Sequence, residues 1–256
     1  MPEDQPGQAR PPRGTAHIGT SGWSYDHWAG VFYPPGLPAA KRLAYYAARL
    51  DTVELNASFY HWPRESSFAG WRERLPEGFV LSVKAPRGLT HGRKLYGPEA
   101  WTERIVRGWH ELGERRGVLL VQLPPDLERD DARLEYFLAA LPGWIRVSVE
   151  FRHPSWDHPE VYALLERHAA AYCVMSGAGL PCILRATAPF VYVRLHGPDP
   201  DRLYAGSYPD DDLRWWAARI GEWLDAGRDF YAYFNNDGGG HAVRNALTLR
   251  DLLGPP

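Results

Sequence analysis

The sequence predicts an α/β protein that folds as a single TIM-type (β/α)8 barrel, irregular at its sixth β/α unit. Eight short apolar runs follow one another along the 256 residues, and segments with helical periodicity separate most of them. A length of about 250 residues is typical of such a barrel. An open doubly wound sheet is the alternative architecture, but neither a GxGxxG nor a P-loop motif follows the first run.

The eight apolar runs are the predicted strands. They are rich in Val, Leu, Tyr and Phe, and β-branched and aromatic residues suit a pleated surface. In chain order they occupy residues 17–20, 52–56, 79–85, 118–123, 145–151, 170–175, 190–196 and 229–235.

Helix signals lie between most of these runs. Asp or Pro residues stand where helices are expected to start, and Gly or Pro where they are expected to stop. The stretch 176–189 is too short and irregular for a full helix, so we expect a loop or a single turn there. The predicted starts are Gly97–Pro98, Asp130, Asp157–Pro159 and, most clearly, Asp210–Asp212, whose helix is stopped by Gly227.

The first 14 residues predict a flexible tail, because they are rich in Pro, Gly and polar residues and have nothing to bury. Residues 15–256 are predicted to form one domain. No run of about 18 apolar residues and no signal-peptide pattern occurs, so we expect a cytoplasmic protein without a membrane partner. Cys173 and Cys182 lack CxxC spacing and are expected to be reduced thiols.

The net charge of the chain limits the kinds of partner that it can bind. The formal net charge is −2, which argues against coating nucleic acid or membrane through bulk charge. Any anion site must therefore be local, and we expect a small anionic ligand. Nucleic acid is a less favoured alternative.

Several predicted strands carry polar residues on one face, although buried parallel strands are usually apolar on both. In the fifth strand Arg146, Ser148, Glu150 and Arg152 alternate with apolar residues. The apolar face must meet the helices, so the polar face should point into the barrel.

Charged and amide side chains gather near the C-terminal ends of the predicted strands, where TIM barrels keep their active sites. We predict four catalytic residues, namely Glu54, Lys84, Glu150 and His196. The predicted substrate-binding residues are Trp23, Tyr25, Asn56, Gln122, Arg152, Arg194, Asn235, Asn236 and Asp237.

Seven short sequence motifs, taken together and in their order along the chain, resemble the domain-of-unknown-function 72 family, the YecE-like TIM barrels. The resemblance runs from about residue 17 to residue 253. It implies a TIM-type barrel and supplies no established reaction. The motifs are GTSGWSYDHWAGVFYP (19–34), VELNASFYHWP (53–63), SVKAPRGLTHGRKL (82–95), QLPP (122–125), VEFRHPSW (149–156), VRLHG (193–197) and YFNNDGGGHAVRNA (233–246).

The first functional hypothesis is an enzyme that uses acid–base chemistry on a small anionic or polyhydroxylated substrate. Glu150 or Glu54 would be the base, with a pKa raised by burial, and Lys84 or His196 the proton donor. Arg152 and Arg194 would clamp a carboxylate or phosphate. Lys84 could also form a Schiff base. A purely structural alternative pairs Glu54 with Lys84 and Glu150 with Arg194.

Two further hypotheses use the same residues. No cofactor is predicted, but Glu54, Glu150, His196 and Asp237 could hold a divalent metal, as in a metal-dependent phosphodiesterase, a nuclease or a sugar isomerase. Alternatively, the barrel is a non-catalytic module that binds an anion or a partner.

Aromatic residues on the loops after the strands could wall a pocket or brace the loops. Six tryptophans in the helix candidates and Trp144 are expected to be packing residues. The loop tryptophans are Trp23, Trp28, Trp62 and Trp156.

Overall fold

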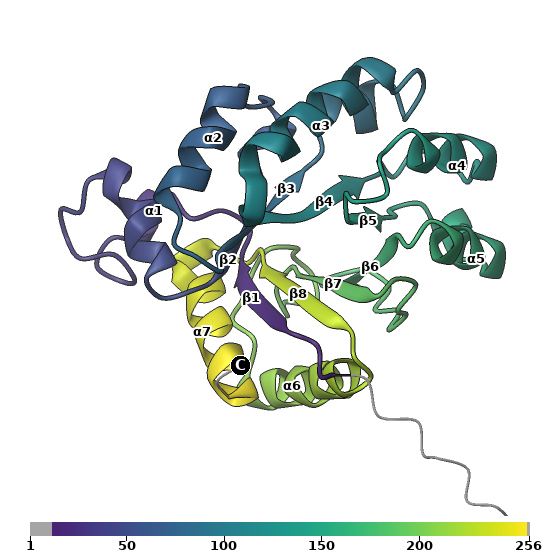
Figure 1. Ribbon diagram of the computed structural model, residues 1–256. Helices are drawn as coiled ribbons and strands as arrows, with labels where there is room; N and C mark the ends of the chain where they lie inside the picture. Colours follow the sequence, from purple (N-terminus) through teal and green to yellow (C-terminus); the bar gives the residue numbers. More distant parts are fainter. Residues whose placement is uncertain (1–11, 255–256) are drawn as a thin grey trace, which may run out of the picture.

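The computed structural model describes residues 12–254, in which eight parallel strands form a nearly closed barrel with helices around it (Figure 1). Every apolar run became a strand, with ends shifted by a few residues at most. The predicted TIM-type fold is therefore confirmed. The strands are β1 (Ala16–Thr20), β2 (Thr52–Leu55), β3 (Val80–Lys84), β4 (Arg116–Gln122), β5 (Val147–Glu150), β6 (Ala171–Ser176), β7 (Phe190–Leu195) and β8 (Asp229–Phe234).

The four helices that begin at Glu99, Asp131, Pro159 and Asp210 start at or directly after the predicted signals. Within the described residues β6 and β7 are joined by a segment without a helix, as the irregular stretch 176–189 predicts. No helix of residues 12–254 is long and apolar enough to cross a membrane. The helices are α1 (Ala39–Ala47), α2 (Glu65–Arg74), α3 (Glu99–Leu112), α4 (Asp131–Ala139), α5 (Pro159–Arg167), α6 (Asp210–Asp225) and α7 (His241–Leu253).

The barrel closes between β1 and β2 through a side chain as well as backbone. The strand order is β1-β8-β7-β6-β5-β4-β3-β2, and β1 meets β2 at a single bridge, Ser21 with Glu54. Below it the hydroxyl of Tyr46, from α1, accepts the N–H of Thr20 at 3.0 Å and donates to the carbonyl of Thr52 at 3.0 Å. The buried Tyr46 hydroxyl thus replaces a missing backbone pair.

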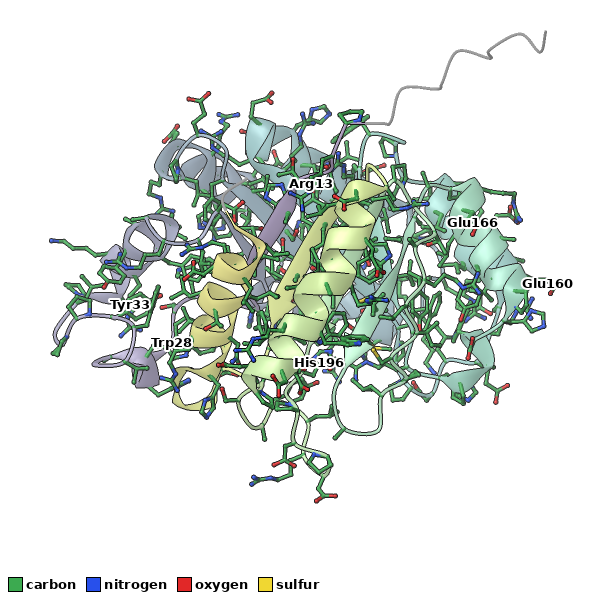
Figure 2. All side chains as sticks on the ribbon, turned by 90° about the horizontal axis from the view of Figure 1, so that it is seen from below. Arg13, Trp28, Tyr33, Glu160, Glu166 and His196 are labelled. Carbon is green, nitrogen blue, oxygen red and sulfur yellow. The ribbon has the colours of Figure 1, made fainter. Side chains whose placement is uncertain are left out.

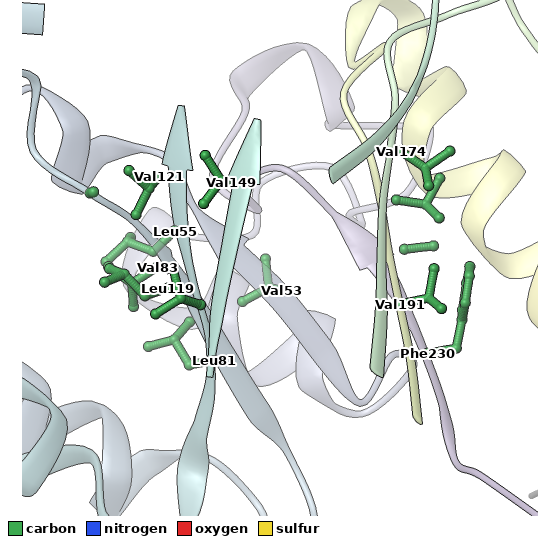
Figure 3. Packing of buried hydrophobic residues seen from close by; sticks show 14 of the residues in the cluster. Val53, Leu55, Leu81, Val83, Leu119, Val121, Val149, Val174, Val191 and Phe230 are labelled. Carbon is green, nitrogen blue, oxygen red and sulfur yellow. The ribbon is translucent and has the colours of Figure 1, made fainter. Parts of the chain in front are cut away.

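Two apolar layers lie on the two sides of the strands. Outward-facing residues such as Val53, Leu81 and Val121 pack in the core that includes the inner sides of the helices (Figure 3). A smaller cluster that includes Leu120 and Tyr231 lies on the other face of the strands. This confirms that the alternation in the sequence separates a helix-facing side from a barrel-facing side.

The tail predicted for residues 1–14 falls mostly outside the described residues, which begin at residue 12. Its last part contacts the barrel: the N–H of Gly14 donates to the carbonyl of Leu224 at 2.9 Å, and Arg13 pairs with Asp225 at 3.0 Å. Arg13 and Gly14, at the end of the predicted flexible tail, therefore contact α6.

Candidate active site

The predicted catalytic residues lie at one end of the barrel. Glu54 is near the end of β2, Lys84 and Glu150 are the last residues of β3 and β5, and His196 follows β7 directly. Figure 2 shows His196 at the opposite end of the barrel from Arg13, which precedes β1. We call the end that holds these four residues the mouth.

A cavity of about 640 Å³ lies at the other end, lined by residues that include Arg13, Leu50, Phe79 and Leu253. The charged residues of its lining are exposed or half-exposed. Buried titratable groups gather instead at the mouth. Burying such groups costs free energy, and groups of this kind cluster at functional sites. We therefore place the candidate site at the mouth.

Arg194, on β7, is the centre of the mouth. Its Nη1 lies 2.7 Å from Oε2 of Glu150, and its Nε and Nη2 lie 3.0 and 2.8 Å from the two oxygens of Glu54. All three side chains are buried, with Arg194 1% exposed. A planar guanidinium can bind two carboxylates in this way because its donors are fixed in a fork.

This arrangement corrects two expectations. Arg194 cannot clamp a ligand as predicted, because its donors already bind Glu54 and Glu150 and no part of it faces solvent. The expected pair of Glu54 with Lys84 is also absent, whereas the expected pair of Glu150 with Arg194 is present.

Glu150 binds two further residues of the mouth. Its Oε1 accepts hydrogen bonds from Gln122 Nε2 and Arg152 Nε, both at 2.5 Å. Burial by itself would raise the pKa of Glu150, but Arg194 and then Arg152 outweigh it and hold that pKa well below its ordinary value. The expectation that burial makes Glu150 a base with a raised pKa is therefore wrong.

Glu54 is held by residues outside the predicted site. The hydroxyl of Ser21 donates to Oε1, and the hydroxyl of Tyr192 donates to Oε2 at 2.6 Å. Tyr192 lies two residues before Arg194 on β7, so the same alternation that points Arg194 inward could have identified it. Together with the hydrogen bonds from Arg194, these bonds give each carboxylate oxygen of Glu54 two donors.

Lys84 differs from the other charged groups of the mouth. It is 9% exposed, and its Nζ lies 4.4 Å from the centre of the Phe59 ring. Within the described part of the chain, no carboxylate oxygen lies within 4.0 Å of that nitrogen. Burial and then the charge of Arg194 lower the pKa of Lys84 from about 10.5 to about 8. Lys84 can therefore exchange a proton near neutral pH.

His196 is a neutral group of the mouth. Burial and then Arg194 hold its pKa well below the ordinary value. Its Nε2 lies 3.5 Å from Nη2 of Arg152, and its Nδ1 lies 3.3 Å from Nδ2 of Asn235. A buried neutral imidazole can accept a hydrogen bond or relay a proton, but it does not supply a positive charge.

The predicted binding residues divide by exposure. Asn56, Gln122, Arg152 and Asn235 are half-buried, so a ligand at the mouth can reach them. Asn236 is fully buried and donates to Gly206 and Asn245 behind the mouth, so its predicted contact with substrate is wrong.

Asn56 carries one of several buried side-chain atoms without a hydrogen-bond partner among residues 12–254, and Oδ1 of Asn236 is another. The atom in Asn56 is also Oδ1. A buried polar atom without a partner costs about 1–3 kcal/mol. Oδ1 of Asn56 is a candidate acceptor for a ligand hydroxyl or a water molecule.

The remaining predicted binding residues belong to the loops beside the mouth. Tyr25 donates from its hydroxyl to the carbonyl of Ser21, and Trp23 is half-buried against the core. Burial and then Asp237 and Glu54 raise the pKa of Tyr25. The Asp237 carboxylate, 31% exposed, lies 3.4 Å from His27 Nε2.

The predicted metal ligands are not brought together. Among the residues that the structure describes, no three His, Cys, Asp or Glu side chains are grouped so that they could hold a metal ion. Glu54 and Glu150 bind Arg194, and Asp237 lies against His27. The residues present do not fit the metal site expected from Glu54, Glu150, His196 and Asp237.

Most loop tryptophans brace the fold. Trp28 is fully buried, Trp62 stacks on Trp109 with ring centres 6.5 Å apart, and Trp156 stacks on Phe151 at 4.8 Å. Trp23 and Trp62 are both half-buried, and Trp23 lies close to the end of the first strand. A wall of tryptophans around a pocket is therefore not formed.

Comparison with known proteins identifies a family and several relatives. A family model described as "Protein of unknown function DUF72" matches residues 17–256. The UPF0759 protein YunF of Bacillus subtilis is 27% identical over 270 residues, which cover 93% of this chain and 94% of YunF. The UPF0759 protein YecE of Escherichia coli K12 is 28% identical over 141 residues, which cover 55% of this chain and 49% of YecE.

Solved structures agree with the fold. A DUF72 family protein from Thermotoga maritima has a TM-score of 0.84 and 29% identity, and the match covers 94% of this chain and all of that one. A DUF72 family protein from Enterococcus faecalis has a TM-score of 0.82 at 18% identity, with 94% and 96% of the two chains covered. None of these names states a reaction.

Proposed function

The chain belongs to the DUF72 family, and from its barrel and its mouth we propose that it is an enzyme that uses acid–base chemistry on a small anionic substrate. The substrate carries a carboxylate or phosphate group, on a polyhydroxylated or other small skeleton. Lys84 is the group that exchanges a proton, and Arg152 and Lys84 attract the anion.

The observation that carries this proposal is the unpaired charge of Lys84. Arg194 and Arg152 bind the two buried carboxylates, so Lys84 adds a third basic group to two acidic ones. When Lys84 is protonated, the group formed by Glu54, Glu150, Lys84, Arg152 and Arg194 carries one excess positive charge, which an anionic ligand would balance. A pKa of about 8 also lets Lys84 change its protonation state near neutral pH, as efficient acid–base catalysis requires.

Each neighbour of Lys84 has a defined part in this proposal. Glu150 stays ionised and fixes Arg152 and Gln122 by hydrogen bonds. Arg152, with a side chain 12% exposed, is placed to bind the anionic group of the substrate. His196 is neutral and can accept or relay a proton beside Arg152.

A non-catalytic barrel that binds a small anion is the second candidate, because the same excess charge favours it. The conservative variant Lys84→Arg separates the two. It keeps the positive charge at the end of β3, but an Arg cannot release a proton near neutral pH.

The experiment follows binding and turnover in wild type, Lys84→Arg and Lys84→Met. Binding is measured by calorimetry with inorganic phosphate and with glyoxylate, and turnover by NMR with a panel of small phosphate and carboxylate esters and oxo acids. We expect Lys84→Met to weaken anion binding about tenfold, a loss of about 1.4 kcal/mol. We expect Lys84→Arg to keep binding and lose turnover.

Two outcomes contradict the proposal. Anion binding that is unchanged in Lys84→Met would exclude Lys84 from the anion site. Turnover that survives Lys84→Arg would remove Lys84 from the acid–base chemistry. Lys94→Met is the matched control, since Lys94, on the loop after β3, already pairs with the Asp126 carboxylate at 2.8 Å.

A further inference from the structure

We propose that Lys84 forms an iminium with the carbonyl group of its substrate, so that the substrate class is a small aldehyde or ketone that also carries a carboxylate or phosphate. This inference rests on the proposed anion site at the mouth and goes beyond it, because it assigns a covalent role and a substrate class.

The surroundings of the three lysines distinguish Lys84. Lys41 is exposed, and Lys94 is bound to the Asp126 carboxylate at 2.8 Å. Lys84 is buried beside the Phe59 ring, and its backbone carbonyl accepts a hydrogen bond of 2.7 Å from the buried hydroxyl of Ser58. A lysine amine becomes a nucleophile when it is desolvated near other cations.

Burial and the cations that face Lys84 favour its neutral form, whereas Glu150 and Glu54 favour its protonated form. Arg194 and Arg152 repel its proton, and the carboxylates that would hold the proton are bound to these arginines. Burial is the larger contribution to its lowered pKa. The charged and titratable groups near it are Glu54 on β2, His91 on the loop after β3, Glu150 on β5, Arg152, Arg194 on β7 and His196.

The reaction balances with the groups available. The lone pair of neutral Nζ attacks the carbonyl carbon, a C–N bond forms, and the C=O π electrons move to oxygen. The nitrogen loses one proton and the oxygen gains one, which gives a carbinolamine. The oxygen then takes a further proton from solvent and leaves as water. Amine, carbonyl and one proton thus become iminium and water, with no oxidation or reduction.

The anionic group of the substrate follows from Arg152. Conversion of the neutral amine into an iminium places a positive charge beside Arg194 and Arg152, which opposes the reaction. A carboxylate or phosphate on the same small molecule would offset that repulsion, and Arg152 is partly exposed to receive it. An uncharged aldehyde lacks this compensation.

The test uses the low lysine content of the chain. The protein is incubated at pH 7 with glyoxylate and sodium cyanoborohydride, which reduces an iminium to a stable secondary amine, and the modified lysines are located by mass spectrometry. We expect Lys84 to be modified roughly tenfold faster than Lys41 or Lys94, because a larger fraction of it is neutral. In urea the three lysines should react alike.

Two comparisons make the test specific. Propanal replaces glyoxylate to remove the carboxylate, and we expect the preference for Lys84 to fall. The Arg152→Gln variant should slow modification of Lys84 by glyoxylate but not by propanal. Circular dichroism checks that this variant is folded.

Modification of Lys84 by glyoxylate no faster than that of Lys41 and Lys94 would overturn the inference. In that case, calorimetry with glyoxylate shows whether only the iminium inference fails or the proposed anion site fails as well. Binding that still depends on Lys84 and Arg152 would leave an anion site in which Lys84 only transfers a proton. Absence of binding would contradict both proposals.

Discussion

The guanidinium of Arg194 lies 2.7 Å from the carboxylate of Glu150, and both side chains are excluded from solvent. The same guanidinium also binds Glu54, so one cation joins β2, β5 and β7 across the barrel. Breaking a buried ion pair on one side leaves an uncompensated charge, which costs about 3–5 kcal/mol. The bond therefore holds the mouth in its observed arrangement.

The first prediction concerns this bond. Arg194→Met should lower the free energy of unfolding by about 3–5 kcal/mol, because it leaves Glu54 and Glu150 buried without their cation. Urea denaturation followed by circular dichroism measures the change. Arg214→Met is the control, since Arg214 pairs with the exposed Asp211 and should change stability little. An Arg194→Met protein as stable as wild type would contradict the arrangement described.

The second prediction concerns Lys84 and alkaline pH. Its pKa is about 8 in the folded protein and about 10.5 when unfolded, so between these values the unfolded chain holds the extra proton. The free energy of unfolding should therefore rise with pH across that window. Below pH 8 the folded protein holds Lys84 in its charged form and bears the full free-energy cost of burying that charge. Lys84→Met should stabilise the protein at pH 7 by up to about 3 kcal/mol.

Urea denaturation at pH 7, 9 and 10 tests this prediction. The advantage of Lys84→Met should shrink as the pH rises, whereas Lys94→Met should show no such trend. A Lys84→Met protein that is less stable than wild type at pH 7 would show that the charge of Lys84 is compensated in the folded state.

The third prediction concerns His196 and acid. The folded protein keeps His196 neutral, with a pKa well below 6.5, whereas the unfolded chain binds a proton there as pH falls through 6.5. Stability should therefore fall as the pH is lowered from 6.5. In His196→Asn this loss should be smaller, as measured by unfolding at pH 7 and pH 5. The control is His61→Asn, at an exposed position. Equal losses in wild type and His196→Asn would contradict a buried neutral imidazole.

The fourth prediction concerns the closure of the barrel. Tyr46→Phe removes the hydroxyl that joins Thr20 on β1 to Thr52 on β2 and leaves both buried backbone groups without a partner. We expect a loss of about 1–3 kcal/mol in the free energy of unfolding. Tyr45→Phe is the matched control, because the Tyr45 hydroxyl makes no hydrogen bond within residues 12–254 and its ring is half-buried. A loss of similar size in both variants would exclude a special role for Tyr46.

The sequence was sufficient for the strands and for the direction in which their side chains point. Alternation in β5 and β7 placed Glu150 and Arg194 inside the barrel, since successive side chains leave a strand on opposite sides. It could not decide which carboxylate each cation binds. Glu54 and Lys84 lie on neighbouring strands, but Arg194 reaches across from β7 because its long planar fork can hold both carboxylates at once.

The sequence also could not predict which residues surround each loop side chain. Trp62 follows β2 as a pocket residue would, yet it stacks on Trp109 of α3, because the packing of α2 against α3 decides where it points. Burial of Asn236 likewise depends on Asn245 of α7, nine residues away in sequence. Such positions depend on contacts between elements, which local patterns do not encode.

NMR can follow the protonation of the Lys84 amine in the folded protein. Lysine labelled with ¹³C at Cε gives one signal for each of the three lysines, and the signal missing from Lys84→Met identifies Lys84. We predict that this signal titrates near pH 8 and shifts when phosphate is added at pH 7. Titration near the ordinary lysine value of about 10.5, without a response to phosphate, would contradict this prediction.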